Sequence, residues 1–209
     1  MTYIYLHGFA SGPTSKKAAY FSRRFAEHGL ELRVPDLTEG DFEHLTLTAQ
    51  LRVVEREAPL YLIGSSMGGY LAALYAARHP EVERVVLLAP AFGFARRWPE
   101  SLGAAQAEEW RRTGWITVYH YAEQTERRIG YQLLEDSARY EDYPAVSQPA
   151  LVFHGRRDTV VPCQFSVEFG ARNPGARVEI IDSDHELVDQ LDYLWGEVAR
   201  FLRIDSPAR

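Results

Sequence analysis

The 209-residue sequence predicts a doubly wound α/β fold, with a mostly parallel sheet of about six strands and one insertion after the fourth strand. Strand-like and helix-like segments alternate along most of the chain, as parallel strands joined by helical crossovers require. The segments at 60–63, 85–88 and 150–153 are continuous apolar runs, which is typical of parallel strands covered on both faces. The length and an apolar content of 46% suit one globular domain, residues 1–209.

The first half of the chain is expected to form three strands and three helices in alternation. Residues 2–7 are rich in β-forming residues, and the short strand at 32–34 is stopped by Pro35. Apolar residues recur at helical spacing in the segments between and after the strands. The expected helices cover residues 16–28, 45–57 and 70–77, and the third strand covers residues 60–63.

The second half begins with the fourth strand and then loses this rhythm. Residues 92–143 contain many aromatic and charged residues, and no strand-like apolar run appears before residue 150. We interpret this segment as an insertion in the sheet domain, called the insertion below. Beyond it the alternation resumes, with strands at 150–153 and 177–181 and helices at 163–171 and 187–202.

The third strand leads into Gly64-Ser65-Ser66-Met67-Gly68, a G-x-S-x-G turn that precedes helix-forming sequence. A strand, such a turn and a helix make a nucleophile elbow, which holds a serine hydroxyl on a sharp corner at the end of a sheet. Small residues are needed two positions before and after the serine, because backbone and helix pass close to the corner. Only Ser66 has glycine at both positions, so we expect Ser66 to be the nucleophile and Ser65 its passive neighbour.

A serine nucleophile needs a base to take its proton and a carboxylate to orient that base. In open α/β sheets, side chains that meet at one site lie on loops at the carboxyl ends of strands. Asp158 and His185 each lie in a loop just after one of the late strands. The order Ser66, Asp158, His185 is nucleophile, acid, base, the order used by α/β-hydrolases. Asp184 is the alternative acid.

Ester hydrolysis passes through a tetrahedral oxyanion, which needs two preorganised N–H donors. Met67 N–H lies at the start of the elbow helix, where the helix dipole adds to its effect. The second donor should come from residues 7–13, the loop after the first strand. Phe9 N–H is the expected donor in this oxyanion loop, and Ala10 N–H is the alternative.

With these residues in place, the chain resembles the α/β-hydrolases over its whole length, and more narrowly the YqiA-like small esterases. The matching segments are Tyr5-Leu6-His7-Gly8-Phe9, Ser11-Gly12-Pro13, Ser15-Lys16, Gly64-Ser65-Ser66-Met67-Gly68-Gly69-Tyr70, His154-Gly155-Arg156-Arg157-Asp158 and Asp184-His185. The resemblance implies an α/β-hydrolase fold that hydrolyses carboxylic esters, with Ser66, Asp158 and His185 as its triad. It is much less specific for the substrate than for the triad.

The insertion is expected to fold as a helical lid over Ser66. Its predicted elements are a helix at 104–112, a turn at 113–114, a short strand at 116–121 and a second helix at 126–138. A lid at this place would form an apolar pocket for a short or medium acyl chain. The alternative is a small core packed on the edge of the domain, and both can hold together.

Aromatic and apolar side chains near the expected site are the candidates for that acyl pocket. They are Phe92, Phe94, Trp98, Trp115, Tyr119 and Val160.

Composition narrows the classes of partner. Twenty-three basic and 29 acidic residues give a net charge of −6, which disfavours nucleic acid and anionic membranes as partners. The sequence holds no segment long enough to span a membrane, no secretory signal, and one cysteine, Cys163, so a cytoplasmic location is expected. Without an H-E-x-x-H motif or a cysteine pair, neither a metal nor another cofactor is expected.

A cofactor-free carboxylesterase acting on a small-molecule ester is therefore the predicted function. The sequence leaves the oligomeric state open. Three alternatives remain: an acyl thioesterase, a hydrolase of C–C bonds with the same triad, and a ligand-binding protein that keeps the fold without turnover.

Overall fold

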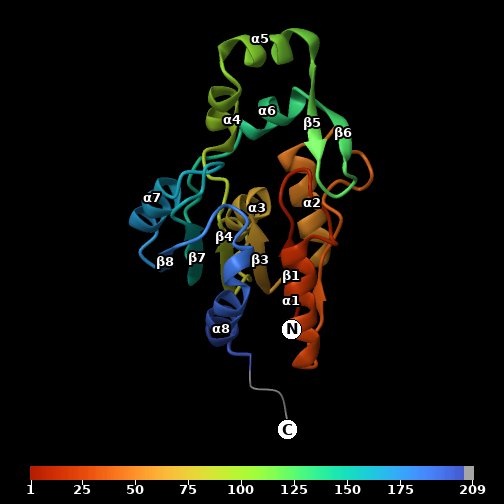
Figure 1. The fold of residues 1–209 in the computed structure, drawn as a ribbon. Helices are drawn as coiled ribbons and strands as arrows, with labels where there is room; N and C mark the ends of the chain where they lie inside the picture. The colour runs from red at the N-terminus through yellow and green to blue at the C-terminus, as the bar shows by residue number, and fades with distance from the viewer. Residues whose placement is uncertain (205–209) are drawn as a thin grey trace.

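The computed structural model describes residues 1–204 and contains a six-stranded sheet in the order β2-β1-β3-β4-β7-β8 (Figure 1). All neighbouring strands in this sheet run parallel, which confirms the predicted architecture. The strands are β1 (Tyr3–Leu6), β2 (Leu32–Arg33), β3 (Tyr61–Ser65), β4 (Arg84–Leu88), β7 (Ala150–Gly155) and β8 (Ala176–Ile181).

Helices cover both faces of the sheet, and alternate residues of each strand pack on opposite faces. In β1, Tyr3 and Tyr5 belong to the core beside α1 and α8, which lie next to each other in Figure 1. Ile4 and Leu6 belong to the core beside α2 and α3. The helices around the sheet are α1 (Lys16–Glu27), α2 (Leu47–Glu57), α3 (Met67–Ala76), α7 (Gln164–Arg172) and α8 (Leu191–Leu202), with a short 3-10 helix η1 (Val188–Gln190) before the last.

Local sequence explains where several of these helices begin. The Ser15 side chain accepts a hydrogen bond from Ala18 N–H at the start of α1, and Thr46 does the same for Ala49 N–H at the start of α2. Helix α3 is apolar on all sides and is buried along its whole length. A helix that is apolar on all sides is buried inside a protein. The buried position of α3 holds the turn at residues 64–68 in place.

The insertion forms a separate layer at the top of Figure 1, above the carboxyl ends of the sheet strands. Its elements are α4 (Phe94–Leu102), α5 (Ala104–Thr113), β5 (Trp115–His120), β6 (Thr125–Gly130) and α6 (Gln132–Ser137). The predicted helix at 104–112 and strand at 116–121 are confirmed within one residue at each end. Helix α4 was not predicted; it contains Pro99, which lacks the N–H that a helix interior uses.

The predicted second helix at 126–138 is wrong in its first half. Residues 125–130 form β6, which pairs antiparallel with β5 and places Ile129 opposite Ile116. Only 132–137 is helical. The cross-strand partner, absent from any local pattern, decides the structure here.

The buried side chains of the insertion belong to the same hydrophobic core as one face of the sheet. Trp110 is fully buried, and its indole N–H donates to Ile129 O at 3.2 Å. Its ring lies 4.8 Å from that of Trp98, whose ring lies 4.9 Å from that of Phe9 in the oxyanion loop. The insertion therefore packs directly against the loop after β1.

No helix within residues 1–204 combines the length and the apolar character needed to cross a membrane.

Candidate active site

Ser66 occupies the corner between β3 and α3. Its backbone has φ 54° and ψ −118°, a conformation that a residue with a side chain adopts rarely. Ser66 N–H donates to Leu88 O on the adjacent strand at 2.9 Å, and Ser66 O accepts from Ala91 N–H at 2.9 Å. Every other residue from 61 to 76 is buried, whereas Ser66 is partly exposed. The turn thus presents one hydroxyl at the surface of a rigid core.

The two glycines around Ser66 lie where no side chain fits. A Cβ on Gly68 would lie 2.1 Å from Leu6 O, and a Cβ on Gly64 would lie 2.2 Å from Gly68 O. Both clashes involve backbone atoms, which cannot move without displacing β1 or α3. These contacts give the physical reason for glycine two positions before and two after the serine.

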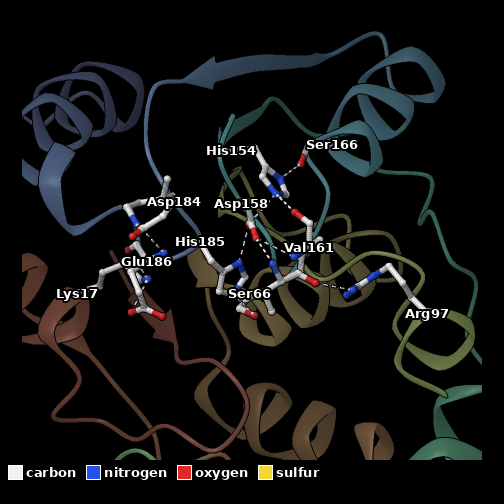
Figure 2. Close-up of polar contacts among 12 residues, drawn as sticks. Lys17, Ser66, Arg97, His154, Asp158, Val161, Ser166, Asp184, His185 and Glu186 are labelled. Carbon is white, nitrogen blue, oxygen red and sulfur yellow. Dashed lines mark hydrogen bonds and ion pairs between the residues drawn. The ribbon is translucent and has the colours of Figure 1, made fainter. Parts of the chain in front are cut away.

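The three predicted triad side chains come together from the loops after β3, β7 and β8 (Figure 2). His185 Nε2 lies 3.0 Å from Ser66 Oγ, and His185 Nδ1 lies 2.7 Å from Asp158 Oδ2. The side chain of Asp184, the alternative acid, accepts instead from the N–H groups of Glu186 and Leu187. Asp184 therefore shapes the turn that carries His185, while Asp158 contacts the imidazole.

Asp158 is buried and accepts four hydrogen bonds. Its Oδ1 accepts from Val160 N–H and Val161 N–H, both at 2.8 Å, and its Oδ2 lies near both His185 and His154. Burial alone would raise the pKa of the Asp158 carboxyl, but the hydrogen bonds from His154 and His185 outweigh it and hold the pKa well below its ordinary value. Asp158 is thus a carboxylate at neutral pH.

The oxyanion loop passes against Ser66. A Cβ on Gly8 would lie 3.4 Å from Ser66 Cβ, so the main chain of the loop approaches the nucleophile closely. Among residues 1–204, neither Phe9 N–H nor Met67 N–H donates a hydrogen bond to the protein. Ala10 has φ 52°, and its carbonyl oxygen accepts from Tyr121 N–H of the insertion at 2.8 Å.

The His7 ring stabilises the same loop through two hydrogen bonds. Its Nε2 accepts from Leu37 N–H at 3.2 Å, so Nδ1 carries the hydrogen and donates to Gly8 O at 3.0 Å. Burial lowers the pKa of His7, which keeps the ring neutral and able to accept. A bracing role for His7 follows from these bonds.

Sequence reasoning missed Lys17. This lysine is 8% exposed, and its Nζ donates to Glu186 O at 2.6 Å, directly beside His185 in the chain (Figure 2). Its Nζ also lies 3.7 Å from the Glu186 carboxylate. Burial lowers the pKa of Lys17, although Glu186 opposes that shift. A lysine on an amphipathic helix normally points to solvent, so the sequence carried no signal for this contact.

Two of the six candidate pocket residues lie beside the site. Trp98 packs edge-on against Phe9 of the oxyanion loop, and Val160, 58% exposed, donates its N–H to Asp158.

The ring contacts of the other four candidate pocket residues are with residues outside the triad and the oxyanion loop. Phe92 is fully buried and stacks on Phe169 at 4.5 Å, and Phe94 is buried against Trp98. Trp115 packs against the His44 ring and Arg128, and Tyr119 is half exposed beside Tyr121. A single acyl pocket lined by all six residues stays a prediction.

Within the described residues, no group of three or more histidine, cysteine, aspartate or glutamate side chains is placed to hold a metal ion.

Comparisons with known proteins find two mammalian proteins of similar sequence. The proteins named palmitoyl-protein thioesterase ABHD10, mitochondrial, from Mus musculus and Bos taurus are 25% and 27% identical over 144 residues. That match covers 65% of this chain and 48% and 47% of theirs, so it spans about half the length of these relatives.

Solved structures share the fold over nearly the whole chain. Alpha/beta hydrolase domain-containing protein 10 from mouse superposes with a TM-score of 0.82 at 21% identity, covering 97% of this chain and 89% of that one. Est1E from Butyrivibrio proteoclasticus, with ferulic acid bound, superposes with a TM-score of 0.72 at 20% identity, covering 96% and 87%. The predicted α/β-hydrolase fold is confirmed.

The profile of a family described as Uncharacterised protein family (UPF0227) matches residues 2–202. The chain therefore belongs to the UPF0227 family and has the α/β-hydrolase fold.

Proposed function

We propose that this protein is a serine hydrolase that cleaves carboxylic esters through an acyl-enzyme formed on Ser66. One observation carries the proposal: an unbroken hydrogen-bonded path runs from Ser66 Oγ through the His185 ring to Asp158, with distances of 3.0 Å and 2.7 Å. This arrangement has the nucleophile–base–orienter geometry that activates a serine hydroxyl.

In the first half of the reaction, Ser66 Oγ attacks the ester carbonyl carbon while His185 Nε2 takes the hydroxyl proton. The Asp158 carboxylate holds Nδ1–H and stabilises the positive ring that forms. The N–H groups of Phe9 and Met67 stabilise the negative charge on the carbonyl oxygen. His185 then returns the proton to the leaving alcohol oxygen, and the acyl group stays on Ser66.

In the second half, His185 takes a proton from water, and the water oxygen attacks the acyl carbon. The second oxyanion uses the same two N–H donors. Collapse of this intermediate breaks the bond to Ser66 Oγ, which receives the proton back from His185, and the carboxylic acid leaves.

Thioester hydrolysis is the second candidate, since the same steps release a thiol in place of an alcohol. The names of the two ABHD10 relatives support it. Rates on oxygen and sulfur esters of one acyl chain, graded from short to medium length, distinguish the two activities. A higher kcat/KM for the sulfur series at every length would make the thioesterase the better assignment.

The proposed partner is a small-molecule ester and the proposed location is the cytoplasm. The net charge of −6 disfavours nucleic acid and anionic membranes as partners, and the single cysteine supports the cytoplasmic location.

The decisive experiment pairs Ser66→Ala with the neighbouring Ser65→Ala. We expect Ser66→Ala to lower turnover of p-nitrophenyl esters by several orders of magnitude, on the roughly 10⁶-fold scale of other triad knockouts. Ser65→Ala should keep most of the activity, because the hydroxyl bonded to His185 Nε2 is that of Ser66. A fluorophosphonate probe should label Ser66 stoichiometrically, and the label should be absent in His185→Ala. Full turnover by Ser66→Ala would refute the proposal.

A further inference from the structure

A second histidine contacts the carboxylate of Asp158. His154 is near the end of β7 and is fully buried, and the mechanism above does not use it. Its Nε2 lies 3.0 Å from Asp158 Oδ2 and 2.8 Å from Val161 O, and its Nδ1 lies 2.7 Å from Ser166 Oγ on α7 (Figure 2). All three partners lie within twelve residues of His154 in the chain.

The chemistry of these partners fixes the hydrogen on the ring. A carboxylate and a carbonyl oxygen only accept, so Nε2 must carry a hydrogen that it shares between Asp158 and Val161. Nδ1 then accepts from the Ser166 hydroxyl. If the ring were charged, Nδ1–H would donate to Ser166 Oγ, and the hydroxyl hydrogen would have no acceptor among its contacts in a fully buried place. The contacts therefore favour the neutral ring with its hydrogen on Nε2.

This tautomer gives Asp158 Oδ2 two imidazole N–H donors, one from His185 and one from His154. Val160 and Val161 N–H hold only the other oxygen, Oδ1. His154 is thus the fixed donor that keeps Oδ2 in place when the His185 ring takes up and releases its proton.

We propose that His154 is a positioning residue: a neutral Nε2–H imidazole, oriented by Ser166, that holds Asp158 Oδ2 toward His185. This inference rests on the proposed function of Asp158. His154 touches no reacting atom and acts only through Asp158.

The first test compares His154→Leu with His154→Gln. Leucine removes the donor, whereas the glutamine amide places an N–H near the position of Nε2. We expect His154→Leu to lower kcat by roughly 10- to 100-fold, the scale of a lost hydrogen bond to a charged group, with KM little changed. His154→Gln should recover most of that loss. Wild-type kcat in His154→Leu, or equal losses in both variants, would overturn the inference.

The second test needs no activity and begins with the wild-type protein. Nitrogen NMR of ¹⁵N-histidine-labelled protein at neutral pH should show His154 as the Nε2–H tautomer, and Ser166→Ala should perturb its Nδ1 resonance. An Nδ1–H tautomer or a charged ring would refute the inference even if His154→Leu fails to fold. The downfield proton of His185 Nδ1–H should shift in His154→Leu and return in His154→Gln.

The two proposals can fail separately. Retained turnover in Ser66→Ala would remove the proposed function, while the tautomer and the His185 proton would still report whether His154 orients Asp158. An inactive Ser66→Ala together with an Nδ1–H tautomer at His154 would remove only the role of His154.

Discussion

The two sides of Ser66 are built in different ways. On the acid–base side, three of the four hydrogen bonds to Asp158 come from residues within four positions of it, and the fourth comes from His185. On the oxyanion side, the loop at residues 7–13 depends on distant parts of the chain. Its Phe9 ring packs on Trp98, and its Ala10 carbonyl accepts from Tyr121 N–H.

This difference shows that the insertion has two tasks. It covers the carboxyl end of the sheet, and it also contacts the loop that carries Phe9, the proposed oxyanion donor. The acid–base side has one hydrogen bond from the insertion, from Arg97 Nη1 to Val160 O at 2.8 Å, whereas the hydrogen bonds to Asp158 itself come from its own loop and from His185. Substitutions on the two sides should therefore differ in size and in how they respond to changes in the insertion.

The largest effect is expected on the acid–base side, from Asp158→Asn. An amide cannot stabilise the charged His185 ring and can favour the wrong tautomer, so kcat should fall by about 10⁴-fold. Asp184→Asn is the matched control, since this side chain bonds the backbone of its own turn. Steady-state kinetics on one p-nitrophenyl ester measures both. A greater loss in Asp184→Asn would mean that the acid is misassigned.

On the oxyanion side, Trp98→Leu removes the ring that packs on Phe9. A small displacement of the donor in the loop should lower kcat/KM by roughly 10- to 100-fold, because catalysis is sensitive to shifts of about 1 Å. Trp115→Leu changes a tryptophan of the same insertion that packs against His44 and Arg128 instead. Kinetics of the two variants should therefore diverge; equal losses would show a general effect of the insertion rather than support of the loop.

Lys17→Met should have a smaller effect, because it loosens the loop of His185 without touching the triad. The variant loses the bond to Glu186 O, and kcat should fall by about 10-fold, the scale of one hydrogen bond from a charged donor. The free energy of unfolding in urea should change little, since methionine fills similar space without a buried charge. Lys16→Met, at the exposed neighbouring position, is the control. Unchanged kcat in Lys17→Met would contradict a role in holding the loop.

The smallest effect is a pH dependence of stability from His7 and His120, both buried near the oxyanion loop. Burial lowers the pKa of each ring below the ordinary 6.5, so the unfolded chain binds more protons below that pH. Above pH 6.5 the two neutral rings contribute fully to the free energy of unfolding. As the pH falls below that value, the free energy of unfolding decreases by up to about 1.4 kcal/mol per pH unit for each ring. Urea unfolding between pH 7.5 and 5.5 measures it. The free energy of unfolding should change less steeply with pH in His120→Gln than in the wild type. An identical slope in both proteins would count against the histidines as the cause.

The sequence predicts best what local patterns determine. The parallel strands follow from apolar runs, and Asp158 and His185 are found because loops at the carboxyl ends of strands meet at one edge. Strand β6 was mistaken for a helix because its partner β5 lies outside any local window.

What the sequence could not predict depends on contacts between distant residues. Lys17 is buried, and Glu186, 169 residues away, supplies its acceptor. Trp98 was predicted as a pocket residue, yet its contact with Phe9 joins the insertion to the oxyanion loop, and no spacing rule contains that pair. The bond from His154 to Asp158 needs the folded turn of residues 155–161, which no local pattern describes.

The bond from Tyr121 N–H to Ala10 O joins two main-chain atoms. Nineteen of the twenty amino acids would keep that N–H at position 121. The side chain there is therefore free to vary between related proteins while the hydrogen bond to Ala10 O is kept. Only proline lacks the donor. Related sequences should accordingly show wide variety at this position and a strict avoidance of proline, together with a constant length of the hairpin that brings the amide to the loop.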